Sequence, residues 1–173
     1  MTTEHPLQAL DGVVGAHIIA TAEEVSRRLT ALGVPHALIG GLAVGIHGHP
    51  RATKDVDFLV GKEAFAQVFP IMVYRDELSE VVRIGVVDLL AVPSNRPELR
   101  LALALPAPGE LPVIPVEALV LMKLDAHRPQ DRADVVALLR SGADLAEVRA
   151  FLAAEAPDLL PRFGSLVAEL FSA

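Results

Sequence analysis

The sequence predicts an α/β protein with a small mixed sheet flanked by helices and a helical C-terminal segment. Short apolar runs alternate with helical periodicity as far as residue 115, and helical patterns alone follow. The chain has 173 residues, 52% hydrophobic and 21% charged, which is enough for one packed core. We therefore expect a core over residues 1–115 and a helical segment over 116–173, packed together as one structural unit.

The first elements follow from periodicity. Apolar residues recur at spacings of three and four over residues 7–32 and predict a helix with one buried face. A short apolar run over 36–39 predicts a strand, which Gly40-Gly41 interrupts before a second helix over 42–47. The alternating stretch Asp-Val-Asp-Phe-Leu-Val over 55–60 predicts the next strand.

Prolines and glycines divide the rest of the chain. Pro70 closes one short helix, and a run rich in Val, Ile and Leu around Gly85 predicts one or two strands. Pro115 precedes the first C-terminal helix, and Pro129 separates it from the second. The predicted elements are a helix over 63–69, strands within 81–92 and over 101–105, and helices over 116–127, 131–139, 144–154 and 161–171.

Composition excludes several classes of protein. Without cysteine, the chain has no disulfide framework, thiolate metal site or thiol nucleophile, which is typical of a reducing cytoplasm, where we expect it. The net charge of −7 and pI of about 5.3 exclude a strongly basic nucleic-acid-binding coat, although a local basic groove stays open.

The mean hydropathy of +0.44 is high, but no membrane segment is expected. The most apolar region, residues 101–122, contains four prolines and two glutamates. Residues 1–6 lack the basic and apolar pattern of a secretory signal. We therefore expect the surplus apolar surface to form an interface in a homodimer or with another partner.

Asp55 and Asp57 form the first chemical motif. Residues two apart on a strand point to the same face, and adjacent carboxylates stay ionised only near cations. Magnesium prefers oxygen ligands and is commonly held by one or two carboxylates together with substrate phosphates. The motif therefore predicts a Mg²⁺ or Mn²⁺ site.

Gly40-Gly41 forms the second motif. Glycine lets the backbone approach a ligand closely, and the start of a helix offers free amide donors to phosphate. A phosphate-binding turn followed by a carboxylate pair describes a nucleoside triphosphate (NTP) site. Asp88 is the candidate third carboxylate, because a lone acid in the apolar run Val86–Leu90 needs a partner.

Each part also has a structural interpretation when taken alone. A glycine pair can be a tight turn, Asp55 and Asp57 a solvated strand edge, and Asp88 a hydrogen-bonded structural acid. Arg51 can serve only to neutralise nearby acids. The order and spacing of the whole combination favour the nucleotide site over these separate interpretations.

The combination of Gly40-Gly41, His47-Gly48 and Arg51-x-Thr53-x-Asp55-x-Asp57 resembles the DNA polymerase β-like nucleotidyltransferases. The branch with AbiEii-like toxin nucleotidyltransferases is the most similar, since it also has a lysine followed by Arg-x-x-Asp-x-x-Asp. Here that signature reads Lys123, then Arg128 to Asp131 and Asp134. The resemblance implies the minimal nucleotidyltransferase fold, a small mixed sheet flanked by helices.

The resemblance also implies roles for individual residues. Those implied to be catalytic are Asp55, Asp57, Asp88 and Lys123, of which the three aspartates also bind metal. Those implied to bind nucleotide are Gly40, Gly41, Arg51, Thr53, Lys123, Asp131 and Asp134. Asp131 is equally well placed to cap its helix, with Asp134 three residues on, so both interpretations stay open.

The implied activity is transfer of a nucleoside monophosphate from an NTP to an acceptor hydroxyl of RNA or protein, with a cognate antitoxin as a candidate partner. Two alternatives are a nucleotidyltransferase acting on a small, antibiotic-type alcohol and a non-catalytic NTP-binding module. Arginines in the helical segment are either a basic face for RNA or scattered surface charges. They are Arg128, Arg132, Arg140, Arg149 and Arg162.

Overall fold

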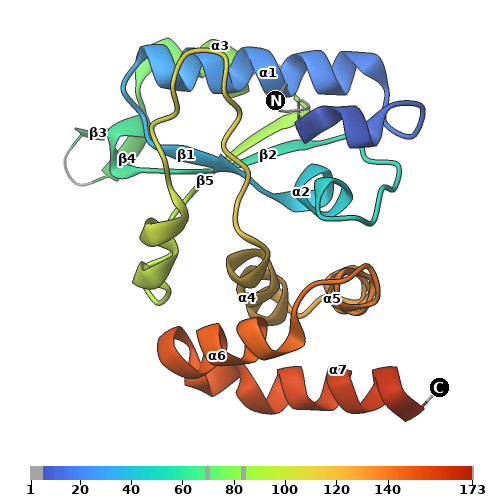
Figure 1. The fold of residues 1–173 in the computed structure, drawn as a ribbon. Coiled ribbons are helices and arrows are strands. Elements are labelled where there is room, and N and C mark those ends of the chain that lie inside the picture. The colour runs from blue at the N-terminus through green and yellow to red at the C-terminus, as the bar shows by residue number, and fades with distance from the viewer. Residues whose placement is uncertain (1–5, 69–70, 83–84, 173) are drawn as a thin grey trace.

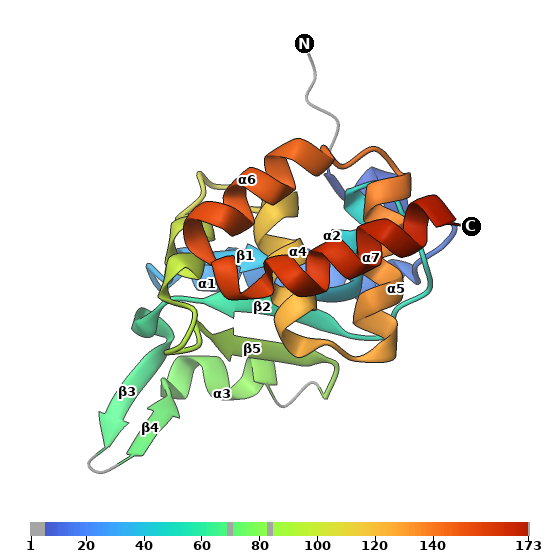
Figure 2. The same ribbon diagram turned by 90° about the horizontal axis from the view of Figure 1, so that it is seen from below.

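A three-stranded mixed sheet lies between two layers of helices (Figure 1). The central strand β2 (Val56–Val60) pairs antiparallel with β1 (His36–Leu38) and parallel with β5 (Val87–Ala91). A second sheet is the hairpin of β3 (Phe65–Val68) and β4 (Ile71–Tyr74), which projects from the body (Figure 2). This computed structural model describes residues 6–68, 71–82 and 85–172.

Side chains along β2 alternate between the two faces of the sheet, and each face packs in a different apolar cluster. Val56, Phe58 and Val60 are fully buried and pack in one apolar cluster with the helix α1 (Ala16–Ala31). Leu59 packs in the other cluster, with the C-terminal helices. Asp57 therefore shares the face of Leu59, toward the C-terminal helices.

The C-terminal helices form the layer on that second face (Figures 1 and 2). Their apolar residues join one buried cluster with Leu59 and with Ala43 and Val44 of the short helix α2 (Gly40–Ile46). The expected small mixed sheet, flanked by helices and followed by a helical segment, is confirmed. The four C-terminal helices are α4 (Val116–Ala126), α5 (Pro129–Arg140), α6 (Leu145–Glu155) and α7 (Leu160–Ser172).

Two predicted helices in the N-terminal half are wrong in extent or type. The helix expected over 7–32 is a 3₁₀ helix, Pro6–Leu10, followed by α1, because the chain turns between them at Gly12, whose φ is +78°. The helix expected over 63–69 is a short 3₁₀ turn followed by β3, because pairing with β4 overrides local helix propensity. Residue 69 lies outside the described residues.

Two further segments have different outcomes. One or two strands are expected within 81–92, and the described residues there form one, β5, although residues 81–82 end the helix α3 (Asp76–Val82), which packs beside β5. Residues 83–84 lie outside the described part. The segment 101–105 ends a 3₁₀ helix, Pro97–Ala102, and contributes only a single bridge from Ala104 to His36.

Membrane-spanning helices are absent from the described ranges, since none of their helices has the length and apolarity to cross a bilayer. The expectation of no secretory signal rests on residues 1–6, of which residues 1–5 lie outside these ranges.

Candidate active site

Three carboxylates gather on the sheet face that carries the C-terminal helices. Asp57 in β2 and Asp88 in β5 are register partners on neighbouring parallel strands, so both side chains point to the same face. Asp55 lies two residues before Asp57, just outside the strand, and is exposed like Asp88. Asp57 itself is partly buried.

The electrostatics of Asp57 show how close these groups are. Burial raises the pKa of Asp57, and the charges of Asp88 and Asp55 raise it further. Lys123 and Arg128 act in the opposite direction. A cation held between the acids would relieve this repulsion.

The metal ligands implied by the sequence do not form a complete ion-binding cluster within the described part of the chain. In the described residues, no three Asp, Glu, His or Cys side chains are already arranged around one ion. Magnesium is typically held by one or two carboxylates plus substrate phosphates rather than by a complete protein cage. Asp57 and Asp88, with Asp55 beside them, supply carboxylate oxygens of that kind.

The glycine pair packs against Asp57 and the 51–54 loop. Gly40 begins α2 with a φ of +66°, and a Cβ built there would overlap the Asp57 carboxylate. Only glycine therefore fits this position. A Cβ on Gly41 would lie 2.9 Å from the Thr53 hydroxyl oxygen and 3.5 Å from an Arg51 Nη1 atom. The pair thus brings the backbone next to Asp57, Thr53 and Arg51.

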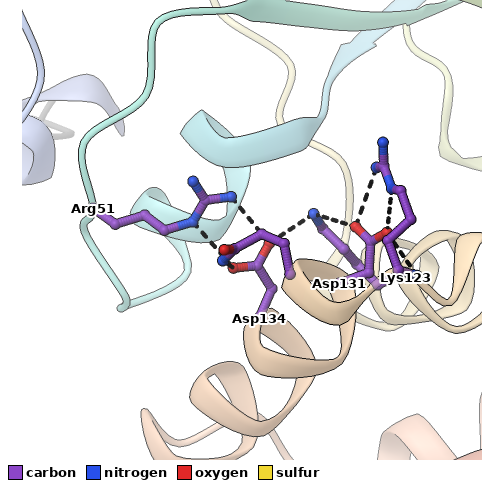
Figure 3. A network of polar contacts seen from close by, with 6 residues as sticks. Arg51, Lys123, Asp131 and Asp134 are labelled. Atoms are coloured by element: carbon purple, nitrogen blue, oxygen red, sulfur yellow. Dashed lines mark hydrogen bonds and ion pairs between the residues drawn. The ribbon is translucent and has the colours of Figure 1, made fainter.

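Asp134 is the centre of a polar network between the 51–54 loop and the C-terminal helices (Figure 3). Its carboxylate accepts two parallel bonds from Arg51, at 3.0 and 3.1 Å, and one from Lys123 Nζ at 2.7 Å. Gln130 Nε2 donates a fourth, at 2.9 Å. With 1% of the residue exposed, Asp134 is inaccessible to solvent but fully hydrogen-bonded.

Asp131 is the second carboxylate that accepts a hydrogen bond from Lys123. Lys123 Nζ donates to its Oδ1 at 3.0 Å, and Arg128 donates through Nε at 2.6 Å and through its backbone N–H at 3.3 Å. The backbone bond caps the start of α5, so Asp131 both caps a helix and pairs with cations. It is also 1% exposed.

The bonds to cations decide the ionisation of both buried acids. Burial raises the pKa of Asp131, but the hydrogen bonds from Arg128 and Lys123 outweigh it, so the pKa is lowered. Burial acts likewise on Asp134, and the bonds from Arg51, Lys123 and Gln130 outweigh it there. Both carboxylates are therefore ionised at neutral pH.

The structure thus brings together residues that lie far apart in the sequence. The acids and the glycine pair come from the sheet and α2, and Lys123 comes from α4. Asp131 and Asp134 lie buried behind Lys123, in contact with cations. The sequence places Arg128 in the second signature and among the arginines of a candidate basic face, and it gives Gln130 no role. In the structure Arg128 binds Asp131 and Gln130 binds Asp134.

The remaining arginines do not gather with Arg128. Arg132 pairs with Glu169 at 2.9 Å, and with Arg140 it lines a groove of about 500 Å³ beside α5 and α7. Arg149 lies over the Phe163 ring, 5.5 Å from its centroid, and Arg162 donates to the carbonyl oxygen of Leu124. None of the three acids on the sheet lines that groove.

Comparison with known proteins gives a likeness of fold. No family model matches the chain, and no curated protein sequence matches it. Among solved structures, one similar to this chain is the crystal structure of an antigenic nucleotidyltransferase-like protein from Paracoccidioides brasiliensis. It is 16% identical over 91% of this chain and 94% of that chain, with a TM-score of 0.49. A likeness at this level does not assign an activity.

Proposed function

We propose that this protein is a nucleotidyltransferase that moves a nucleoside monophosphate from an NTP to an acceptor hydroxyl. The observation that carries the proposal is the in-register pair Asp57 and Asp88, facing Lys123 and Arg128 beside a glycine pair. Carboxylates for metal on one side and cations for phosphate on the other are what a triphosphate complex requires.

In the reaction, the acceptor oxygen attacks the α-phosphorus, and the bond from that phosphorus to the oxygen bridging to the β-phosphate breaks. Pyrophosphate leaves, and the proton of the acceptor hydroxyl passes to a carboxylate, for which we propose Asp88. Divalent metal held by Asp55, Asp57 and Asp88 would neutralise the triphosphate and acidify the attacking hydroxyl.

The cations bind and orient the substrate. Lys123 and Arg128 act electrostatically on Asp57, so we assign them to the phosphates of an NTP bound there. Arg51 and Thr53 lie against Gly41, so we assign both side chains to the same phosphate-binding region as the glycine pair. Asp131 and Asp134 act through these cations, because both carboxylates are buried and bonded to them. Positioning and charge neutralisation supply most of the catalysis in phosphoryl transfer.

The acceptor that we propose is a hydroxyl of RNA or protein, by resemblance of the two sequence signatures to toxin nucleotidyltransferases. Incubation with each α-labelled NTP, magnesium and a cell lysate would identify the labelled product. Label in RNA or protein supports this acceptor class, and label only in a small molecule contradicts it.

Calorimetry tests the nucleotide site itself. We expect at least one of ATP, CTP, GTP and UTP to bind in magnesium and none to bind with chelator. Asp57→Asn keeps the size of the side chain but removes its charge, so metal-dependent binding and transfer should be lost. Its melting temperature without metal should equal or exceed that of the wild type, because repulsion from Asp88 and Asp55 is relieved.

The matched control is Asp76→Asn, which removes an exposed acid from α3 and should bind NTP as the wild type does. Folded wild-type protein that binds no NTP in magnesium would refute the proposed function. Full activity in Asp57→Asn would show that the Asp57 carboxylate is not needed for the reaction.

A further inference from the structure

The only tyrosine of the chain connects the hairpin β3–β4 to the edge of the main sheet. Tyr74 ends β4, and its hydroxyl donates a 2.5 Å hydrogen bond to the carbonyl oxygen of Leu89 in β5. Its ring stacks on Phe65 of β3, with the centroids 5.1 Å apart and an angle of 29° between the rings. The hydroxyl is thus held at a fixed place beside β5.

This bond acts on the residue that follows Asp88. In the described sheet β5 is an edge strand, paired only with β2, so its outer side depends on contacts such as this one and the packing of α3. Asp88 and Asp57 repel each other across the β2–β5 pair, which tends to push the edge strand outward. A donor anchored on Leu89 resists that displacement.

The phenol is also suited to remain a donor. Burial raises the pKa of Tyr74, and the nearby Asp88 carboxylate raises it further. The hydroxyl therefore keeps its proton over the physiological range, and it lies within the field of Asp88.

We propose that Tyr74 is a positioning residue, whose hydroxyl holds β5 so that the Asp88 carboxylate stays opposite Asp57. The inference rests on the proposed function, in which Asp88 acts on the acceptor hydroxyl. Loss of the hydroxyl should therefore slow transfer and leave NTP binding, which also uses Asp55, Asp57 and the cations, unchanged.

Tyr74→Phe tests this, because it keeps the ring and its stacking on Phe65 and removes only the donor. One readout is hydrogen–deuterium exchange of the β5 amides in the protein without ligand. The other is incorporation of label from α-labelled NTP into a cell lysate, as a function of NTP concentration. We expect at least tenfold faster exchange in β5, about a tenfold lower kcat and an unchanged KM for NTP, as the loss of one hydrogen bond implies.

The matched control is Ser79→Ala, which removes a hydroxyl that donates to the Asp76 carbonyl within α3. It should change neither readout. Wild-type exchange of β5 in Tyr74→Phe would overturn the inference whatever the activity is. Faster exchange with a wild-type kcat would overturn it as well, because β5 would then be loosened without effect on transfer.

The two proposals fail differently. A wild-type protein that neither binds nor transfers NTP refutes the proposed function, and the role of Tyr74 in transfer falls with it. NTP binding and transfer that are unaffected by Tyr74→Phe refute the role of Tyr74 alone.

Discussion

His36 shows how a single buried side chain sets a pH dependence. It is fully buried in β1, where Nδ1 donates to the Val34 carbonyl and Nε2 accepts from the Ser26 hydroxyl, each at 2.8 Å. We assign the proton to Nδ1 because the Val34 oxygen can only accept. Burial lowers the pKa of His36, and the bond to Val34 only partly opposes this.

The neutral form of His36 therefore stabilises the fold. In the unfolded chain the ring takes up a proton near its ordinary pKa of about 6.5, whereas the folded protein does so only at lower pH. The free energy of unfolding should thus fall as pH decreases below about 6.5, by at most about 1.4 kcal/mol per pH unit. Urea unfolding from pH 5 to 8 measures this, with the exposed His17→Gln as a control of unchanged slope. A nuclear magnetic resonance titration of His36 with a midpoint at or above 6.5 would contradict the assignment.

At the scale of elements, α4, α5 and the 51–54 loop are joined by buried charges. Asp134 binds Arg51 and Lys123, so it fixes two cations from different parts of the chain. Removing one partner of such a group leaves the others buried without compensation, which commonly costs about 3–5 kcal/mol.

We expect Asp134→Asn to weaken NTP binding at least tenfold and to lower the free energy of unfolding by about 3–5 kcal/mol. Chemical denaturation and calorimetry on the folded fraction measure the two effects. Asp144→Asn is the control, since Asp144 caps α6 on the protein surface and should cost about 1 kcal/mol or less without loss of binding. Wild-type NTP affinity in folded Asp134→Asn would show that the Asp134 network does not contribute to NTP binding.

Much of the fold was predictable because the strands β1, β2 and β5 are strongly apolar and the C-terminal helices are periodic. The hairpin was not, because Phe65–Val68 has no period of its own and becomes a strand only by pairing with β4. The shared orientation of Asp55 and Asp57 was predictable from their spacing, and Asp88 was singled out because it is a lone acid in an apolar run. The bond from Tyr74 to Leu89 was not predictable, since it depends on where the hairpin meets the sheet.

For the whole molecule, Arg96 links the connection after β5 to the C-terminal layer. It is 8% exposed and binds Asp125 at the end of α4 and Asp158 before α7, at 2.6 and 2.7 Å. The bonds to Asp158 and then Asp125 raise the pKa of Arg96. Because the Asp158 side chain is exposed, solvent screens its ion pair with Arg96, and this pair stabilises the fold less than the pair with Asp125 does.

We expect Arg96→Met to lower the free energy of unfolding by about 1–3 kcal/mol, because Asp125 loses a buried donor. For a protein of this size that is a fall in Tm of about 2–10 °C, which thermal denaturation followed by circular dichroism measures. Arg27→Met is the matched control, since Arg27 pairs with Glu24 on the exposed side of α1 and should change the free energy by less than about 0.5 kcal/mol. Equal losses in the two variants would show that the link through Arg96 adds nothing to the stability of the fold.

The balance of charge at the candidate site bears on which form of a nucleotide it would accept under the proposed function. The formal charge of the site without ligand is −2, because it contains three cations and five carboxylates. The cations are Arg51, Lys123 and Arg128, and the carboxylates are Asp55, Asp57, Asp88, Asp131 and Asp134. A bare triphosphate, with about four negative charges, would meet net repulsion, whereas the same nucleotide with two divalent ions is close to neutral. Under the proposed function, we therefore expect the site to discriminate against metal-free nucleotide. Since the complex that enters carries little charge, its affinity should depend only weakly on ionic strength.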